Sequence, residues 1–338
     1  MNICLLNRYF DFRGTGVTRI ATEVSAELER KGNKVIRVAT AGDSLPAYAF
    51  QTGIAAPFRI PRRGIDVYHA LATLEAMWLP KDKSIATYLD LFTTTNPDRA
   101  GAGMGYSKWK MEIGRRYFAI GSQIAARCRY LVCISEKTKQ DVLEHIKPEE
   151  GKLRVIKLGI SNTLKTEKRG STRFTLGTLS QLDKRKRIDL LIQQFHSTNL
   201  DADLLIAGGG PDRVKLEGLA NGDKRIKFLG RVPENELSAF YNQLDVFCFP
   251  TAIEGYGLPA VEAMACKKPV LVLQDAIVPD EIKIRCAKTD SFAMSMDDYE
   301  AVISETDYDN NMVFATEHRW ERCVGEYLEL YQSIKEGR

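Results

Sequence analysis

The sequence predicts an α/β protein built from two parallel-sheet domains, and three observations support this prediction. Short apolar runs alternate with helix-length periodic segments along the whole chain, which is the pattern of strands joined by crossover helices. With 338 residues, the chain exceeds the usual size of one hydrophobic core. Polar residues 159–172 interrupt the periodicity, so we expect the interdomain linker there. We predict domains over residues 1–160 and 173–315, followed by a helical segment over 316–338.

In the first domain, six apolar runs are expected to be strands because they are short and rich in Val, Ile, Leu and Tyr. The runs cover residues 2–7, 34–40, 66–71, 84–89, 130–135 and 153–158. Periodic segments predict helices over residues 17–32 and 108–128, and a third helix follows Ser135. Gly32 suits the C-terminal stop of the first helix, and Ser135 suits the N-cap of the third.

The second domain repeats this alternation. Strands are expected over residues 174–179, 203–210, 226–231, 245–250 and 269–273, the second of them including its turn. Helices are expected over residues 189–198 and 233–244. The last periodic segment, residues 316–337, is too long to be a frayed tail, so we expect a packed helix.

Composition excludes several classes of protein. Hydrophobic residues make up 44% and charged residues 27%, as in ordinary soluble proteins. No apolar run approaches the roughly 18 residues of a spanning helix. The N-terminal MNICLLNRYF lacks the basic start and cleavage site of a signal peptide, so we interpret it as the first strand. The seven cysteines are scattered without a CxxC pair, which favours buried, reduced thiols in a cytoplasmic protein.

The charge is unevenly distributed. Residues 1–160 hold 25 Lys and Arg against 16 Asp and Glu, a net charge of +9, whereas residues 161–338 carry −5. Basic and apolar residues interleave over 58–63 and 108–130, a pattern that suits anionic lipid at the inner face of a membrane, or an anionic acceptor. The alternative is a solvated helix whose apolar stripe packs into the core. That stripe is Trp109, Ile113, Tyr117 and Ile120. No nucleic-acid motif accompanies the charge, so we expect no nucleic-acid partner.

The most informative segment, residues 250–272, reads PTAIEGYGLPAVEAMACKKPVLV. It contains the end of a strand, a turn with Gly255 and Gly257, a helix and a second apolar run. Glu254 and Glu262 flank the turn and the helix start. A helix N-terminus offers unpaired N–H donors and partial positive charge to an anion. Carboxylates accept hydrogen bonds from hydroxyls. The segment therefore predicts a site for a ligand that carries both phosphate and hydroxyl groups.

EGYGLPAVEAMA (254–265) resembles the EGFGLPxLEAMA signature of family 4 retaining glycosyltransferases, which are enzymes of the GT-B fold. GTLSQLDKRKRID (177–189) resembles the GTLxxRKN basic loop of mannosyltransferase-like members. Altogether six segments resemble the family in the right order. The resemblance implies two Rossmann-like domains with parallel sheets facing a central cleft. The N-terminal domain would bind the acceptor, the C-terminal domain the donor, and the last helix would cross back to the first domain.

The resemblance maps Arg185 and Lys186 onto the pair that neutralises the departing diphosphate. Glu254 would bind hydroxyls of the donor sugar. Cleavage of a nucleotide-sugar bond builds charge on the β-phosphate, and preorganised cations stabilise that charge. We expect the neighbouring Lys184 and Arg187 to be only solvated.

The resemblance also implies donor contacts. Glu262 would hold the ribose, and backbone N–H groups near Gly257 would meet the phosphates. The loop with Gly14 and Gly16 would let backbone approach a diphosphate, although a dinucleotide-binding fold would use such glycines too. The acidic residue expected for a dinucleotide ribose is absent. The implied donor-binding residues are Gly16, Gly209, Gly230, Arg231, Glu254, Gly255, Tyr256, Gly257, Leu258 and Glu262.

Three departures from the family pattern concern the chemistry. Family members commonly carry a histidine where this chain has Leu89, and Asp90 follows as usual. His69 on the preceding strand is an acceptor-side candidate, or else a packed core residue. Lys268 replaces the glycine usual before the last apolar run, and residues 274–282 replace a Gly-rich loop.

We predict a glycosyltransferase that moves a sugar from a UDP- or GDP-type donor to a glycan or lipid-linked acceptor with retention of configuration. We expect no cofactor and no metal. The sequence Asp201-Ala202-Asp203 has the form of a metal motif, but it precedes its strand, so we interpret it as a solvated loop. A GT-B sugar-nucleotide epimerase and a non-catalytic nucleotide-sugar-binding protein remain alternatives, and an NAD-dependent dehydrogenase is a more distant one.

Overall fold

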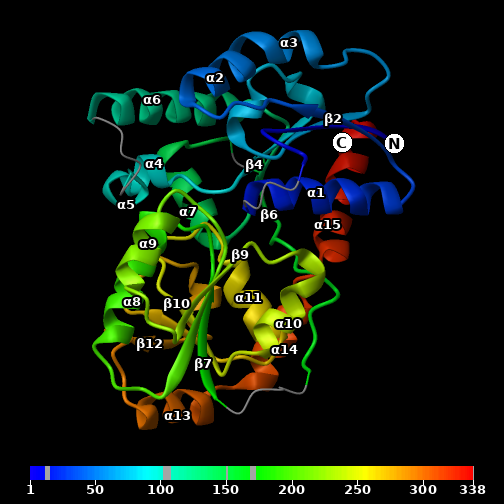
Figure 1. Cartoon of the computed structure of the whole chain (residues 1–338). Helices are drawn as coiled ribbons and strands as arrows, with labels where there is room; N and C mark the ends of the chain where they lie inside the picture. Colours follow the sequence, from blue (N-terminus) through cyan, green and yellow to red (C-terminus); the bar gives the residue numbers. More distant parts are fainter. Residues whose placement is uncertain (12–15, 102–107, 150, 168–172, 338) are drawn as a thin grey trace. The chain divides into compact units, whose positions relative to one another are not determined.

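The structure is a computed structural model that describes residues 1–11, 16–101, 108–149, 151–167 and 173–337. The chain folds as two compact units, whose elements are labelled in Figure 1. The first unit comprises Met1–Gly101, the segment that ends at Gly159, and the C-terminal stretch from Trp320. The second unit comprises Ile160–Arg319.

The first unit is built on a sheet whose described strands are all parallel, in the order β2-β1-β3-β4-β5-β6. The strands are β1 (Asn2–Asn7), β2 (Lys34–Ala39), β3 (Val67–Ala70), β4 (Ser84–Tyr88), β5 (Tyr130–Cys133) and β6 (Leu153–Val155). The six predicted strands are confirmed, although β6 is shorter than predicted. β3 and β4 are buried throughout, as expected of central strands in a parallel sheet.

Helices cover the sheet of the first unit. They are α1 (Gly16–Arg30), α2 (Leu45–Phe50), the π-helical turn η1 (Gln51–Ala55), α3 (Ala56–Arg59), the 3₁₀ turns η2 (Thr73–Ala76) and η3 (Lys81–Lys83), α4 (Phe92–Thr95), α5 (Pro97–Gly101), α6 (Lys108–Ala125), α7 (Glu136–His145) and α15 (Trp320–Lys335). Ser135 caps α7 as predicted, accepting a bond from the Thr138 N–H at 3.1 Å. The C-terminal helix α15 lies beside α1, where Arg30 pairs with Glu321 at 2.8 Å.

Helix α6 corrects one expectation. Its packed face consists of small residues, among them Gly114 and Gly121. A Cβ on Gly121 would lie 2.2 Å from the Leu74 Cδ2, so a larger residue there would require the Leu74 side chain to move. The bulky stripe, which the alternative interpretation of this helix placed in the core, is instead largely exposed. Its exposed members are Trp109, Ile113 and Ile120.

The second unit has a parallel sheet of the same size in its described residues, in the order β12-β11-β10-β7-β8-β9. The strands are β7 (Phe174–Leu179), β8 (Ala202–Ala207), β9 (Ile226–Gly230), β10 (Val246–Phe249), β11 (Val270–Leu273) and β12 (Ala287–Thr289). The first five were predicted. β12 was missed because it has only three residues, one of them Lys288.

The helices of the second unit are α8 (Ile188–His196), α9 (Arg213–Ala220), α10 (Leu237–Asn242), α11 (Leu258–Ala265), α12 (Asp280–Lys283), α13 (Met296–Glu305) and α14 (Tyr308–Thr316). The 3₁₀ turns are η4 (Lys184–Lys186) and η5 (Glu234–Glu236). The predicted last helix is divided, because α14 ends at Thr316 in the second unit and α15 begins at Trp320 in the first.

Candidate functional site

In the sheet of the second unit, the direction in which successive strands are added reverses between β7 and β10. From β7 the chain adds β8 and β9 on one side, then returns to place β10 on the other. In open α/β sheets, ligands bind outside the carboxyl ends of the strands at such a switch point. The loops that follow β7 and β10 meet here, and they carry the predicted Lys186 and Glu254.

The basic loop after β7 is shaped by its own residues. Asp183 is the N-cap of the 3₁₀ turn η4, and its carboxylate accepts a bond from the Lys186 N–H at 3.3 Å. Arg187 then adopts a left-handed backbone, with φ of 51°. The turn directs Lys186 inward, whereas Lys184 stays exposed as predicted.

Lys186 and Glu254 form a buried ion pair. The Lys186 ammonium donates to Glu254 Oε1, and Arg185 Nη1 lies 3.6 Å from Glu254 Oε2. Burial raises the pKa of Glu254, but the two cations outweigh it, so the pKa lies below its ordinary value. Burial, opposed by Glu254, lowers the pKa of Lys186. The structure thus brings together the three residues predicted to be catalytic, from loops 68 residues apart in the chain.

Arg187 is not the solvated residue that we expected. Its guanidinium donates to the carbonyl oxygens of Pro250 at 2.7 Å and Thr251 at 2.8 Å, and it pairs with Asp275 at 2.8 Å. It therefore ties together the loops after β7, β10 and β11. A signal was present in the sequence, because the family pattern has Asn at this position, and Asn tolerates a left-handed backbone.

The unusual loop 274–282 supports the Glu254 turn. Ile253 and Ile277 form an isolated parallel bridge. Within it, the Glu254 N–H donates to the Ile277 carbonyl at 2.8 Å. This loop thus fixes the backbone from which the Glu254 side chain projects, a role that its sequence did not suggest.

Helix α11 begins four residues after Glu254. Gly257 is its N-cap, has φ of 110°, and provides no side-chain cap. Leu258 is the first helical residue and Pro259 the second, as proline prefers. The preceding Gly255 lies in the turn, and Tyr256 is buried. The helix therefore presents its positive end to this side of the sheet.

The glycines at the ends of β8 and β9 differ in whether the backbone and the packing require glycine. Gly208 has φ of 118°, and a Cβ there would lie 1.8 Å from the Ser180 carbonyl oxygen. The predicted contact residue Gly209 is exposed, and a Cβ there would meet nothing within 4 Å. Gly230 also has a positive φ, and the following Arg231 is exposed. Gly208 is thus required by packing, whereas no neighbour requires glycine at Gly209, whose carbonyl oxygen accepts a bond from the Leu182 N–H at 3.0 Å.

Glu262 is more deeply buried than we expected for a residue that holds a ribose. Its side chain has no exposed surface, and its carboxylate accepts a hydrogen bond from the Tyr241 hydroxyl at 2.7 Å. A contact with a ribose would require this carboxylate to become accessible. The ribose role remains a prediction.

The acceptor-side candidates lie in the first unit, His69 on β3 and Asp90 just after β4. His69 is fully buried, with Nδ1 2.6 Å from the Tyr331 hydroxyl and Nε2 2.8 Å from the Thr87 hydroxyl. Burial lowers the pKa of His69 to about 3. Both ring nitrogens are thus engaged, and the structure supports the packed interpretation instead of the acceptor role. Asp90 is exposed and accepts a bond from the Phe92 N–H at 3.2 Å.

Gly16 begins α1, and a Cβ on it would meet nothing within 4 Å. Gly14 lies outside the described residues.

Sequence reasoning missed Glu75, which is buried after β3. Its Oε1 accepts bonds from the hydroxyls of Tyr48 at 2.6 Å and Thr40 at 3.0 Å. Burial raises the pKa of Glu75. No motif surrounds this residue, so only the tertiary structure identifies it.

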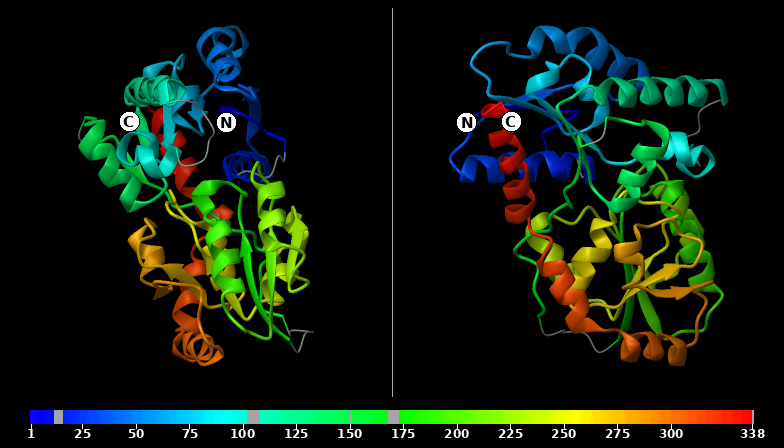
Figure 2. Two further views of the ribbon diagram at one scale, coloured as in Figure 1. Left: turned by 60° about the vertical axis from the view of Figure 1, so that its left-hand side comes forward. Right: turned by 180° about the vertical axis from the view of Figure 1, so that it is seen from behind.

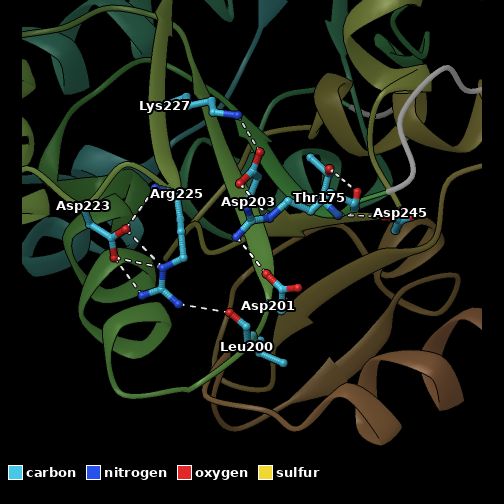
Figure 3. A network of polar contacts seen from close by, with 9 residues as sticks. Thr175, Leu200, Asp201, Asp203, Asp223, Arg225, Lys227 and Asp245 are labelled. Carbon is cyan, nitrogen blue, oxygen red and sulfur yellow. Dashed lines mark hydrogen bonds and ion pairs between the residues drawn. The ribbon is translucent and has the colours of Figure 1, made fainter.

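The acidic pair Asp201 and Asp203 lies at the opposite edge of the second sheet, where strands begin (Figure 3). Arg173 pairs with Asp201 at 2.9 Å and with Asp203 at 3.2 Å. Asp203 also pairs with Lys227, so it is neutralised by cations and not merely solvated. Nearby, Arg225 pairs with Asp223 at 2.7 Å. Within the described residues, no group of three or more His, Cys, Asp or Glu could hold a metal ion.

Comparisons with known proteins agree with this geometry. Residues 161–285 match the family described as glycosyl transferases group 1. The chain is 24% identical over 217 residues to an uncharacterised glycosyltransferase of Methanocaldococcus jannaschii, covering 61% of this chain and 60% of that protein. It is 26% identical over 174 residues to O-antigen chain mannosyltransferase B of Escherichia coli, covering 46% and 45%. The chain thus spans less than two thirds of the length of these relatives.

Solved structures resemble the chain over its full length. Sucrose-phosphate synthase from Thermosynechococcus elongatus has a TM-score of 0.79 at 16% identity and covers 100% of both chains. Anabaena HepE in complex with UDP-glucose has a TM-score of 0.70 at 15% identity, covering 97% of this chain and 99% of that one. Such likeness shows the fold, so the predicted GT-B class is confirmed. In the part of the chain that is described, no helix is both long and apolar enough to span a bilayer.

Proposed function

We propose that this protein is a glycosyltransferase that moves a hexosyl group from a nucleoside-diphosphate sugar to a hydroxyl of a glycan or lipid-linked acceptor. The observation that carries the proposal is the buried Lys186–Glu254 pair at the switch point, flanked by Arg185 and followed by the N-terminus of α11. The family match of residues 161–285 and the glycosyltransferase names of the relatives support it.

In the proposed reaction, the second unit holds the donor by its diphosphate. Lys186 has three N–H donors, and its bond to Glu254 occupies one of them. The other donors and the Arg185 guanidinium would stabilise the charge that develops on the departing phosphate. The α11 N-terminus adds its partial positive charge. These cations supply the electrostatic stabilisation, so the proposed reaction uses no metal or other cofactor.

Glu254 would bind sugar hydroxyls instead of attacking the anomeric carbon. Its carboxylate is held between Lys186 and Arg185, and this pairing lowers its nucleophilicity as well as its pKa. We propose retention of configuration because residues 254–265 resemble the signature of retaining enzymes. With Glu254 unsuited to attack, the acceptor hydroxyl would bond to the anomeric carbon on the face from which the diphosphate leaves, and it would lose its proton as that bond forms. NMR of the product's anomeric signal would test this.

We place the protein in the cytoplasm. All seven cysteines are free and buried, which fits a reducing compartment. The acceptor would be bound by the first unit.

A thermal-shift screen with UDP- and GDP-sugars tests donor binding, because a ligand of the folded state raises the apparent melting temperature. We expect one nucleotide-sugar to stabilise the wild type and the Lys184→Ala variant, but not Lys186→Ala. Lys184→Ala is the matched control because it removes an exposed lysine of the same loop. Absence of any nucleotide-dependent shift in the wild type would contradict the proposal.

The alternatives give different products. Incubation of the enzyme with its donor and no acceptor yields an isomeric nucleotide-sugar if the protein is an epimerase. A non-catalytic binding protein would be stabilised by the donor without releasing nucleoside diphosphate. A glycosyltransferase releases it slowly by hydrolysis and faster with acceptor, which a coupled assay of the released nucleotide measures.

A further inference from the structure

We propose that the first unit docks on the surface of an anionic lipid bilayer through an exposed apolar surface. Six side chains define this surface: Phe50, Ile54, Phe58, Trp78, Trp109 and Ile113. Each is more than half exposed, and Phe58 is 88% exposed. Soluble proteins rarely gather large apolar groups in this way unless the surface meets a partner.

Two helical stripes supply most of the apolar surface. Phe50, Ile54 and Phe58 recur every four residues along the continuous helical run of α2, η1 and α3. Trp109 and Ile113 show the same spacing on α6. Residues four apart share one face of a helix, so each stripe presents a coherent apolar side.

The two stripes belong to one surface because Thr52 joins their elements. Thr52 lies in η1, and its hydroxyl is hydrogen-bonded to Tyr117 of α6. Its carbonyl oxygen accepts a bond from Trp78 Nε1 at 2.9 Å. A Cβ on Gly114 of α6 would lie 3.3 Å from Leu45 of α2. Figures 1 and 2 show α2, α3 and α6 on the same outer side of the unit.

The stripe formed by Trp109 and Ile113 faces outward because of the way α6 packs. Gly114 and Gly121 lie in the packed face, so the helix approaches its neighbours closely by its smallest residues. The chain thus leaves Trp109 and Ile113 in solvent, although glycines in a helix interior cost stability. A helix that only had to cover the sheet could have buried its aromatic side.

Basic residues accompany the apolar surface and indicate its occupant. Arg62 and Arg63 are exposed just beyond α3, and Lys110 is exposed beside Trp109. Arg116 pairs with Glu112, which also pairs with Arg115, so this trio keeps one positive charge. Aromatic side chains with a basic rim suit the surface of an anionic bilayer. The aromatic groups can enter the boundary between headgroups and acyl chains while the basic groups meet the anionic headgroups.

This inference goes beyond the proposed function, because the surface needs no nucleotide-sugar to bind lipid. The experiment is co-sedimentation of the purified full chain with vesicles of phosphatidylcholine, with and without phosphatidylglycerol. We expect binding to the phosphatidylglycerol vesicles, weakening as salt is added. On binding, fluorescence of the exposed Trp78 and Trp109 should shift to shorter wavelength and be quenched by brominated lipid, whereas Trp320 is buried within the unit.

Two variants separate the apolar and charged contributions. Phe58→Ser should weaken vesicle binding at least about tenfold, since burial of a Phe side chain contributes more than this factor. Arg62→Gln should weaken it about fivefold. Ile284→Ser is the matched control, because Ile284 is 68% exposed but belongs to the second unit. Circular dichroism would show that all three variants are folded.

Three results would overturn the inference. The first is that the wild type fails to sediment with phosphatidylglycerol vesicles. The second is that Phe58→Ser binds as well as Ile284→Ser. The third is a dimer, seen by light scattering, that Phe58→Ser dissociates, because the surface would then belong to a second copy of the chain. None of these results bears on donor binding, so the two proposals can fail separately.

Discussion

Glu75 in the first unit and Glu254 in the second occupy corresponding places and have opposite electrostatic settings. In each sheet the strand order reverses beside the first strand, and the next strand is then added on its other side: β3 beside β1, and β10 beside β7. Glu75 lies five residues after the end of β3 at Ala70, and Glu254 lies five residues after the end of β10 at Phe249. Both are buried. Glu75 accepts bonds from two neutral hydroxyls, and its pKa is raised by burial. Glu254 lies between two cations, which hold its pKa low against burial.

The difference shows what distinguishes the candidate binding site from a structural polar cluster on the same scaffold. Burial alone does not make a glutamate functional, since both are buried. Only Glu254 is accompanied by a cluster of cations and by a helix N-terminus, groups that an anionic ligand requires. The comparison yields testable differences between the two units.

The largest expected effect is that of Lys186→Ala on turnover. Removal of one preorganised donor to developing charge typically costs about 10²–10³ in rate. Release of nucleoside diphosphate from the donor found in the thermal-shift screen measures it. Lys184→Ala should turn over normally. Wild-type turnover in the Lys186 variant would remove this lysine from the site.

Glu254→Gln should destabilise the second unit by about 3 kcal/mol, because it leaves the buried Lys186 ammonium without its counter-charge. Chemical denaturation followed by fluorescence measures the free energy of unfolding. A loss below about 1 kcal/mol would mean that the pair is better solvated than its burial indicates.

Arg187→Ala should cost about 2 kcal/mol, since it removes charged hydrogen bonds to two carbonyl oxygens of the β10 loop. It should also lower turnover, because that loop carries Glu254. Asp275→Asn is the control and should cost less than about 1 kcal/mol, as its carboxylate is half exposed. Equal effects of both variants would argue that only the ion pair matters.

Glu75→Gln should be tolerated and change the pH dependence of stability. The folded-state pKa of Glu75 lies above the ordinary 4.5, so the unfolded chain releases this proton first. The wild type therefore loses stability as pH rises from about 4.5 through the folded-state pKa. The variant should lack this loss and be equally or more stable at neutral pH. Unfolding curves across pH measure it, and a large destabilisation at neutral pH would contradict a raised pKa.

The smallest effect is expected from Asp203→Asn, at the strand-start edge shown in Figure 3. Its partners Arg173 and Lys227 are about half exposed, so each pair contributes less than about 1 kcal/mol. Turnover should be unchanged, with or without added divalent metal. A metal-dependent loss of turnover would revive the metal interpretation of Asp201 and Asp203.

The sequence by itself determined most of the strands, some of the helices and the segments that carry the candidate site, whereas α2, α9 and α13 were not predicted. Eleven of the described strands coincide with predicted apolar runs, because strands of parallel sheets are buried on both faces and leave a strong local signal. The signature around Glu254 and the basic loop around Lys186 were likewise recognisable, since each lies within a short stretch of chain.

Only the tertiary structure decided which of those residues meet and which side of a helix is packed. It paired Lys186 with Glu254, engaged Arg187 with three loops, and locked His69 between β4 and α15. It also turned the aromatic stripe of α6 outward, because close approach by glycine outweighed the pattern of bulky residues. These outcomes depend on contacts between distant segments, which hydrophobic periodicity within one segment cannot specify.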